Sequence, residues 1–167
     1  MAIGELIGGA VGILLLVIVA YVLVGATLST AEIVSSAQQD LTQSQITRLH
    51  TEIRVSDVKI DYTNPDWIVH FNITNTGSET VKSLDNMDVF ILTTNTTPET
   101  SPDRYYFGDG SYPTWNVTGH SPDYIHPGQL DPGETFSAFA IVPHPEEERP
   151  GWIEVVTGNG AYSSAYI

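Results

Sequence analysis

The feature that most constrains this chain is an uncharged apolar run near its N-terminus. Residues 6–28 read LIGGAVGILLLVIVAYVLVGATL, and no charged residue lies between Glu5 and Glu32. A helix rises about 1.5 Å per residue, so this run spans roughly 30 Å or slightly more, which is the thickness of a bilayer core. A secretory signal peptide has a basic n-region and a shorter apolar core, and this run has neither. Residues 1–28 are therefore predicted to form a hydrophobic helix that is a membrane anchor or part of a filament core.

Small residues recur along the start of this helix. Gly4, Gly8 and Gly12 are spaced by four residues and lie on one helix face, where they let two helix backbones approach closely. This spacing predicts self-association through the N-terminal helix, although glycine is also common in membrane helices without such a role. Glu5 is either an interfacial carboxylate exposed to water or one that meets the amino group of a neighbouring subunit, as in type IV pilins.

Residues 29–53 are predicted to continue the helix as a stalk beyond the membrane. This segment contains no Gly or Pro, and a thin apolar stripe follows helical spacing. The stripe consists of Ile33, Ala37, Leu41, Ile46, Leu49 and Ile53. A stripe this narrow, with Gln and Ser elsewhere, suits a helix that contacts a partner along one side.

Residues 54–167 show the two-residue period of half-buried strands. Val58, Ile60 and Tyr62 alternate with charged residues, and similar runs follow between turn-forming sequences. The predicted strands are 58–62, 67–73, 80–82, 87–93, 135–143, 152–157 and 161–167. About seven short strands indicate an immunoglobulin-like antiparallel β-sandwich, so the chain is predicted to be mainly β with a long N-terminal helix.

Residues 94–130 are predicted to form a long loop, rich in Thr, Pro, Asp and Gly, within the sandwich. Aromatic residues are concentrated in it: Tyr105, Tyr106, Phe107, Tyr112, Trp115 and Tyr124. Long loops in compact domains are often functional. The aromatic side chains either form a surface for carbohydrate or protein binding, with Trp115 as the residue to test, or fold back over the end of the sandwich.

Charge excludes one class of partner. The chain has 6 basic and 20 acidic residues, a formal net charge of −14 and a sequence pI of about 4.3. Such a surface repels phosphate backbones, which argues against nucleic-acid binding.

The chain also lacks cysteine, which excludes disulfides and thiolate metal sites. Sequons at Asn72, Asn95 and Asn116 are candidate glycosylation sites and favour export.

Candidate catalytic and metal-binding chemistry is sparse. His120 and His126 flank Asp123, which makes a surface metal site conceivable, but solvated histidines are the simpler interpretation. Asp103 and Asp109 lack the ligand periodicity of a calcium loop. No nucleophile elbow, P-loop or dinucleotide fingerprint is present in the sequence. The sequence predicts a protein that is not an enzyme, with no cofactor, no metal and no catalytic residue.

Three short motifs stand behind the helix in a fixed order. They are the turn NTGS at 75–78, the turn PGET at 132–135 and the tail VVTGNGAYSSAY at 155–166. Together with the apolar helix and the Ser/Gln-rich stalk, they give a chain that resembles the archaeal flagellin-related family, and within it the archaellum accessory proteins FlaF and FlaG.

The resemblance implies a sandwich outside the cytoplasmic membrane, held by the N-terminal helix. It implies a stator-type role in the archaellum, with the S-layer or another envelope protein and other archaellum proteins as partners. The related archaellins instead form the filament through the same kind of helix. Their precursors carry a short basic leader ending in Lys/Arg-Gly, which is not seen here, and this favours the accessory role. A single-pass adhesion or carbohydrate-binding module is the remaining alternative. No binding residue transfers from the resemblance.

Overall fold

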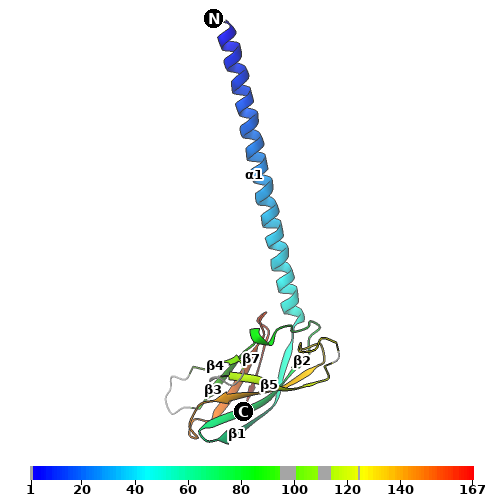
Figure 1. Cartoon of the computed structure of the whole chain (residues 1–167), viewed down its shortest axis with the longest axis vertical. Helices are drawn as coiled ribbons and strands as arrows, with labels where there is room; N and C mark the ends of the chain where they lie inside the picture. The colour runs from blue at the N-terminus through cyan, green and yellow to red at the C-terminus, as the bar shows by residue number, and fades with distance from the viewer. Residues whose placement is uncertain (1, 95–100, 109–113, 124) are drawn as a thin grey trace. The chain divides into compact units, whose positions relative to one another are not determined.

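The computed structural model describes residues 2–94, 101–108, 114–123 and 125–167, with the backbone alone for residues 2, 3, 5 and 6. It contains one long helix and a β domain (Figure 1). The chain divides into two compact units, Met1–Ser44 and Gln45–Ile167. Each unit is described by itself.

Helix α1 runs without a break from Ala2 to His50 (Figure 1). Every described side chain of the unit Met1–Ser44 is exposed, including the large apolar ones of the run 6–28. The helix is apolar and long enough to cross a bilayer. An apolar helix surface that meets nothing in its own chain requires lipid or other helices around it.

The end of α1 differs from the prediction. The helix stops at His50, three residues short of the predicted end at Ile53. Ile53 instead begins the first strand, and its side chain is 4% exposed. Burial in the sandwich core therefore decides the conformation of Ile53, although its spacing also fits the helical stripe.

Eight strands form one mixed sheet in the order β1-β2-β6-β5-β4-β3-β7-β8. Their bounds are β1 Ile53–Thr63, β2 Asp66–Asn75, β3 Asp88–Thr93, β4 Asp103–Phe107, β5 Thr114–Ser121, β6 Thr135–Val142, β7 Pro150–Val156 and β8 Tyr162–Tyr166. A short 3-10 helix, η1, spans Leu84–Asn86. Neighbouring described strands are antiparallel except β4 and β5, which run parallel.

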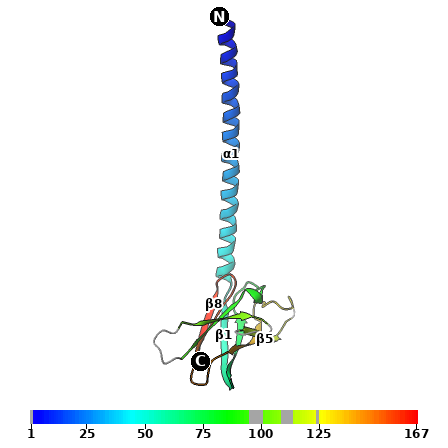
Figure 2. The same cartoon turned by 60° about the vertical axis from the view of Figure 1, so that its left-hand side comes forward.

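The sheet folds over a single core and nearly closes into a barrel. Strand β4 joins its two halves: Tyr105 pairs with Val89 of β3, whereas Phe107 pairs with Trp115 of β5. At the other end β1 lies beside β8, where the Val55 N–H donates to Ser163 Oγ over 3.0 Å (Figure 2). The predicted fold class, mainly β with a long N-terminal helix, is confirmed.

The alternation predicted from the sequence sets which side chains enter the core. Along β2, buried residues alternate with half-buried or exposed ones, as expected of a strand with one face inward. Six strands contribute fully inaccessible side chains, which include Val69, Ile73, Val89, Ile91, Tyr105, Trp115, Phe136, Ala140 and Ile153, and Leu130 adds another from outside the strands.

The predicted loop 94–130 is corrected by the structure, because it contains strands β4 and β5. Tyr105 and Trp115 are both fully buried, and the Phe107 ring lies 5.0 Å from that of Trp115. The Asp, Gly, Thr and His residues that neighbour these aromatic residues in the sequence interrupt the apolar–polar alternation by which a strand is predicted. Tyr112 and Tyr124 lie outside the described residues.

The predicted strand 80–82 is also corrected. Within the described residues it is reduced to a single bridge, in which Val81 and Leu130 exchange backbone hydrogen bonds of 3.0 Å. The side chains of Val81 and Leu130 are nevertheless buried in the core. The Val81 side chain therefore faces inward although the segment does not belong to the sheet.

Candidate interaction site at the end of the long helix

The NTGS turn holds the last residues of α1 against the sandwich. The N–H groups of Ser78 and Glu79 donate to His50 O over 2.9 and 3.2 Å. Those of Thr76 and Gly77 donate to Glu52 O over 2.8 and 2.9 Å. The last carbonyl of a helix has no partner within the helix, so the turn supplies the donors that would otherwise be missing.

Glycine is required in this turn by close approach. A Cβ atom built on Gly77 would fall on Glu52 N and His50 O, which are backbone atoms and cannot move aside. The side chains add one more contact, since His50 Nδ1 lies 3.1 Å from Ser78 Oγ. The turn and the helix end are thus fitted backbone to backbone.

Asn75 joins the NTGS turn to the PGET turn. It is fully buried, and its Nδ2 donates to Glu79 O and Leu130 O over 2.8 and 2.9 Å. Its Oδ1 accepts from Gly77 N over 3.0 Å. Its backbone O accepts from Gly133 N over 2.8 Å. Because each of these polar groups has a hydrogen-bond partner, burying Asn75 costs little free energy. Asn75 can therefore hold both turns in place.

The PGET turn is braced by a buried carboxylate. Asp131 is 3% exposed and accepts hydrogen bonds from Thr80 Oγ over 2.7 Å and from His126 N over 3.1 Å. The Thr80 hydroxyl is the largest influence that holds the pKa of the Asp131 carboxyl below its ordinary value. The Asp131 N–H in turn donates to Glu134 Oε2 over 3.0 Å.

The tail motif completes the site from the other side. Asn159 Nδ2 donates to Thr51 Oγ over 2.7 Å, and Thr51 Oγ lies 2.8 Å from Thr47 O in the last turns of α1. Gly160 has a φ of +82°, which favours glycine, and the Arg48 guanidinium lies against it. The NTGS turn and the tail motif, far apart in the sequence, thus converge on residues 48–52, and the PGET turn is joined to them through Asn75.

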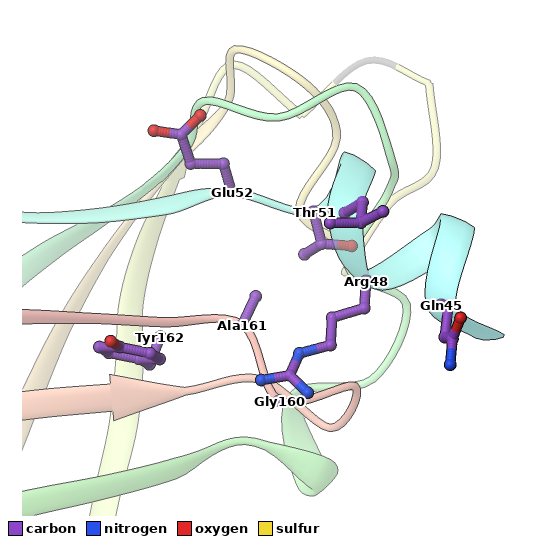
Figure 3. Close-up of a pocket in the computed structure, with 8 residues that line it drawn as sticks. Gln45, Arg48, Thr51, Glu52, Gly160, Ala161 and Tyr162 are labelled. Atoms are coloured by element: carbon purple, nitrogen blue, oxygen red, sulfur yellow. The ribbon is translucent and has the colours of Figure 1, made fainter.

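A pocket of about 580 Å³ opens where the helix end meets the β7–β8 hairpin (Figure 3). The Arg48 side chain points toward Gly160, and Tyr162 lies on the same hairpin (Figure 3). Leu49 and Tyr162 are 84% and 65% exposed. Among the described residues, no carboxylate forms an ion pair with Arg48. A cation beside exposed apolar groups can bind a partner chain.

The predicted helix-packing residues lie on an open helix surface. Nothing lies within 4 Å of a Cβ built on Gly4, Gly8 or Gly12, so the space that close helix packing needs is available. The backbone of Glu5 is helical, whereas its side chain is outside the described set. Packing through this face stays a prediction.

Two of the three sequon asparagines lie within the described residues. Asn72 is on the outer face of β2, as predicted, where it donates to Asp57 Oδ2 and accepts from Ser137 Oγ. Asn116 is half-buried on β5 and donates to Gly108 O over 2.9 Å. Asn95 lies outside the described residues. Glycosylation stays a prediction at all three positions.

The histidines that flank Asp123 do not share a site. His120 Nδ1 lies 3.2 Å from Asp123 Oδ2, whereas His126 Nδ1 lies 2.9 Å from Asp131 Oδ1. In the described part of the chain, no group of three such side chains has the geometry to hold a metal ion. Of the two acidic residues considered for calcium, Asp103 contacts His144 and Asp109 lies outside the described residues.

The arrangement of the three motifs was not predicted from the sequence. Each had been recognised as a turn or a strand, but the bonds of the NTGS turn to Glu52, of the tail to Thr51 and of the PGET turn to Asn75 depend on the fold. The available signal was the concentration of Asn, Thr and Gly in short segments, since these residues form side chain–backbone hydrogen bonds at turns.

Comparison with known protein families identifies a family for this chain. The family model for archaeal-type flagellin matches residues 5–166. Two similar solved structures from Sulfolobus acidocaldarius are the archaellum periplasmic stator protein FlaG and the complex of FlaF and FlaG. Each of the two is 20% identical in sequence to this chain, with a TM-score of 0.49 over 70% of this chain. The match covers 99% of the FlaG chain and 89% of the chain from the FlaF and FlaG complex. No curated protein matches the sequence.

Proposed function

The chain belongs to the archaeal-type flagellin family, and from this membership we propose that it is a membrane-anchored, stator-type component of the archaellum. The membership confirms the resemblance predicted from the sequence. In the proposal, residues 6–28 cross the cytoplasmic membrane and the β domain lies outside. The domain binds a fixed envelope protein such as the S-layer. The role requires no catalysis.

The observation that carries the proposal is the division within α1. One unbroken helix is apolar over residues 6–28 and polar over residues 29–50, apart from its thin stripe. The apolar part matches a bilayer in length. A helix buried along its whole length in a filament core would need apolar surface beyond residue 28 as well. The pattern therefore favours a membrane anchor followed by a solvated stalk.

Charge supports placing the β domain outside. Residues 45–167 carry 17 acidic and all 6 basic residues of the chain. A surface of this charge stays soluble and is repelled by anionic lipid headgroups. A stator must resist torque, so the domain requires a partner that does not rotate, and a protein lattice outside the cell is such a partner.

Anchoring is tested with a pair of matched arginine substitutions. Leu15→Arg places a charge at the centre of the apolar run, where an arginine costs about 2.5–3.5 kcal/mol of insertion free energy. Leu41→Arg is the control, because Leu41 is equally exposed but lies in the polar part of α1. The first variant is expected to leave the carbonate-washed membrane fraction of archaeal cells and the second to remain there. Equal retention of both would contradict the anchor.

Orientation is tested with single cysteines, because the natural chain has none. Ser101→Cys lies on an exposed segment of the β domain, and Ala2→Cys lies at the other end of the chain. A membrane-impermeant maleimide is expected to label the first in intact cells and the second only after lysis. The reverse result would place the β domain inside.

A filament subunit is the second candidate function. The family is named for flagellins, and the open face at Gly4, Gly8 and Gly12 would allow helices to bundle. The two roles are separated by shearing filaments from cells: a stator remains with the membrane, whereas a subunit is a major component of the filament. Finding this chain in the filament wall would overturn the stator proposal.

The adhesion alternative loses its candidate residue. Trp115, the residue chosen to test an aromatic binding surface, is fully buried on β5, the strand between β4 and β6. We therefore do not propose carbohydrate binding through this residue.

A further inference from the structure

Aromatic side chains gather on the outer face of the half-sheet formed by β3, β7 and β8. Along these strands more buried residues alternate with more exposed ones, and the more exposed ones point outward. The outer face of β2 and β6 is mostly polar by comparison. Five neighbouring outward residues make up the surface that we call the aromatic face: Phe90, Trp152, Glu154, Tyr162 and Tyr166. An exposed group of large aromatic side chains is typical of an interaction surface.

Glu154 lies at the centre of the aromatic face. Trp152 is two positions away on the same strand, and Phe90 of β3 is the direct cross-strand partner of Glu154. On β8, Tyr162 and Tyr166 occupy the two positions diagonal to it. Direct cross-strand neighbours have Cβ atoms about 4.5–5.5 Å apart, and diagonal neighbours are about 7–8 Å apart. Four aromatic residues therefore surround one carboxylate.

The Glu154 carboxylate has no counter-charge in its own domain. Within the part of the chain that the structure describes, no basic side chain forms an ion pair with it. Arg104, the other cross-strand partner of Phe90, is bound to Asp88 instead, with its Nη2 2.7 Å from Asp88 Oδ1. Glu154 is half-buried. A carboxylate that is partly withdrawn from water without a counter-charge costs free energy, which a cation supplied by a partner would recover.

The rings around Glu154 are open to a ligand. Tyr162 and Tyr166 are 65% and 88% exposed. Among the described residues, none of the four rings of the aromatic face stacks on another ring. The face of a Tyr or Trp ring attracts the cation of a Lys or Arg side chain within about 6 Å of the ring centroid. Aromatic rings around a carboxylate are therefore an arrangement that recognises a cationic side chain.

We propose that the aromatic face binds a lysine or arginine side chain of a basic partner protein, with the cation against Glu154. Tyr162 and Tyr166 are four residues apart on one strand, so about 13 Å separate them along β8. A long side chain lies between the two tyrosines with its apolar stem against the rings and its charged end at the carboxylate. The unpaired carboxylate supplies the opposite charge, and the rings supply cation–π attraction and shield the ion pair from water.

Charge selects a basic protein over other occupants. Residues 45–167 carry 17 acidic and 6 basic residues, and this excess attracts a basic surface and repels nucleic acid and anionic lipid. A second copy of the chain has the same net charge of −14 and is repelled as well. A neutral sugar stacks on aromatic rings too, but it supplies no charge opposite Glu154. The proposal goes beyond the proposed function and does not depend on it, because the aromatic face lies wholly on the β domain.

Titration of the full chain in a nonionic detergent with pentalysine tests the role of the carboxylate. Isothermal titration calorimetry at near-physiological salt gives the dissociation constant. Glu154→Gln is expected to weaken pentalysine binding at least about fivefold. Glu147→Gln is the matched control, because it removes the same charge from an exposed position between β6 and β7. The control is expected to weaken binding by less than about twofold. Equal weakening by both substitutions would show a response to net charge alone and would overturn the proposal.

Substitutions of Tyr166 test the role of the rings. Tyr166→Ala is expected to weaken pentalysine binding about threefold, whereas Tyr166→Phe is expected to retain it, because cation–π attraction needs the ring and not the hydroxyl. Phe139→Ala is the control, because Phe139 is an outward, half-buried phenylalanine on β6, and it is expected to leave binding unchanged. Thermal unfolding by circular dichroism verifies that each variant is folded. Equal affinities of Tyr166→Ala and the natural chain would contradict a contact with this ring.

A neutral oligosaccharide is the competing ligand for an aromatic surface. Maltohexaose is expected to give no binding heat with the natural chain under the same conditions. Maltohexaose binding that is lost in Tyr166→Ala, together with pentalysine binding that Glu154→Gln leaves unchanged, would identify the aromatic face as a carbohydrate site and overturn the proposal.

Discussion

Asn159 of the β7–β8 hairpin donates a hydrogen bond of 2.7 Å to Thr51, the residue immediately after the last residue of α1. The two residues are 108 positions apart, and the bond joins the tail of the chain to the end of its helix.

A double-mutant cycle measures this bond. Asn159→Ala and Thr51→Val are each expected to lower the unfolding free energy of the β domain by about 1–2 kcal/mol, because a partly buried polar group loses its partner. The double variant is expected to lose about 1 kcal/mol less than the sum of the two single losses. Denaturant unfolding followed by tryptophan fluorescence gives the values. Strict additivity would show that the two side chains are not coupled.

Gly77→Ala is expected to destabilise the β domain by about 2 kcal/mol or more, because the added Cβ would overlap backbone atoms of Glu52 and His50. Gly119→Ala is the matched control, since nothing lies within 4 Å of its Cβ position and its φ is not in the left-handed region. The control is expected to be neutral or slightly stabilising. A similar melting temperature for both variants would show that the turn can move.

Acid sensitivity is expected from Asp131. Its folded-state pKa is lowered chiefly by the Thr80 hydroxyl, so the carboxylate contributes stability that is fully present above its unfolded pKa of about 3.9. This contribution is lost as the pH falls through the lower, folded value. In Asp131→Asn the melting temperature is expected to fall less steeply over that acid range. Thr80→Val is expected to have a smaller effect in the same direction. If the melting temperatures of the unmodified protein and both variants fell equally steeply at acid pH, Asp131 would not be the group responsible.

Trp115→Ala is expected to cost about 3–5 kcal/mol of unfolding free energy, because it removes a fully buried indole and leaves a cavity. Tyr166→Ala, at an 88% exposed position, is expected to change the stability of the β domain by less than about 0.5 kcal/mol. The comparison separates a core role of Trp115 from a surface role. A stable, folded Trp115→Ala protein would favour the surface role.

Tyr105→Phe is expected to leave stability unchanged or raise it slightly. The Tyr105 hydroxyl is buried and has no hydrogen-bond partner among the described residues, so removing it relieves a desolvation cost. The same burial raises the pKa of Tyr105 above its ordinary value. Spectroscopic titration of the folded protein is therefore expected to show one tyrosine fewer at alkaline pH than the unfolded protein does. Loss of stability in Tyr105→Phe would indicate a partner for the hydroxyl.

The strands that could be predicted were those with strict alternation. Val69, Phe71 and Ile73 alternate with polar residues and are buried as expected. Strand β5 escaped prediction because its sequence, TWNVTGHS, has only two apolar side chains and a register shift that breaks the period. Its place in the sheet is fixed by pairing with β6, a non-local interaction that a local pattern does not reveal.

The candidate site could be predicted only in part. The turn residues Asn75, Gly77 and Gly160 were recognisable from their types, but their neighbours across the fold were not. The helix end is an example: Ile53 continues the apolar stripe that begins at Ile33, yet burial in the core places it in β1. Tertiary packing overrides local periodicity wherever the two compete for the same residue.

The seam between β1 and β8 has a consequence for behaviour in a crowded cell envelope. Free sheet edges recruit strands from other molecules and lead to aggregation. Here the two terminal strands lie beside each other, with Ser163 accepting the Val55 N–H, and Asp57 kinks β1 with a φ of 52° within a register shift. Each edge therefore shields the other from strand addition. Copies of the β domain that are concentrated at one place are therefore expected not to add strands to one another at these edges.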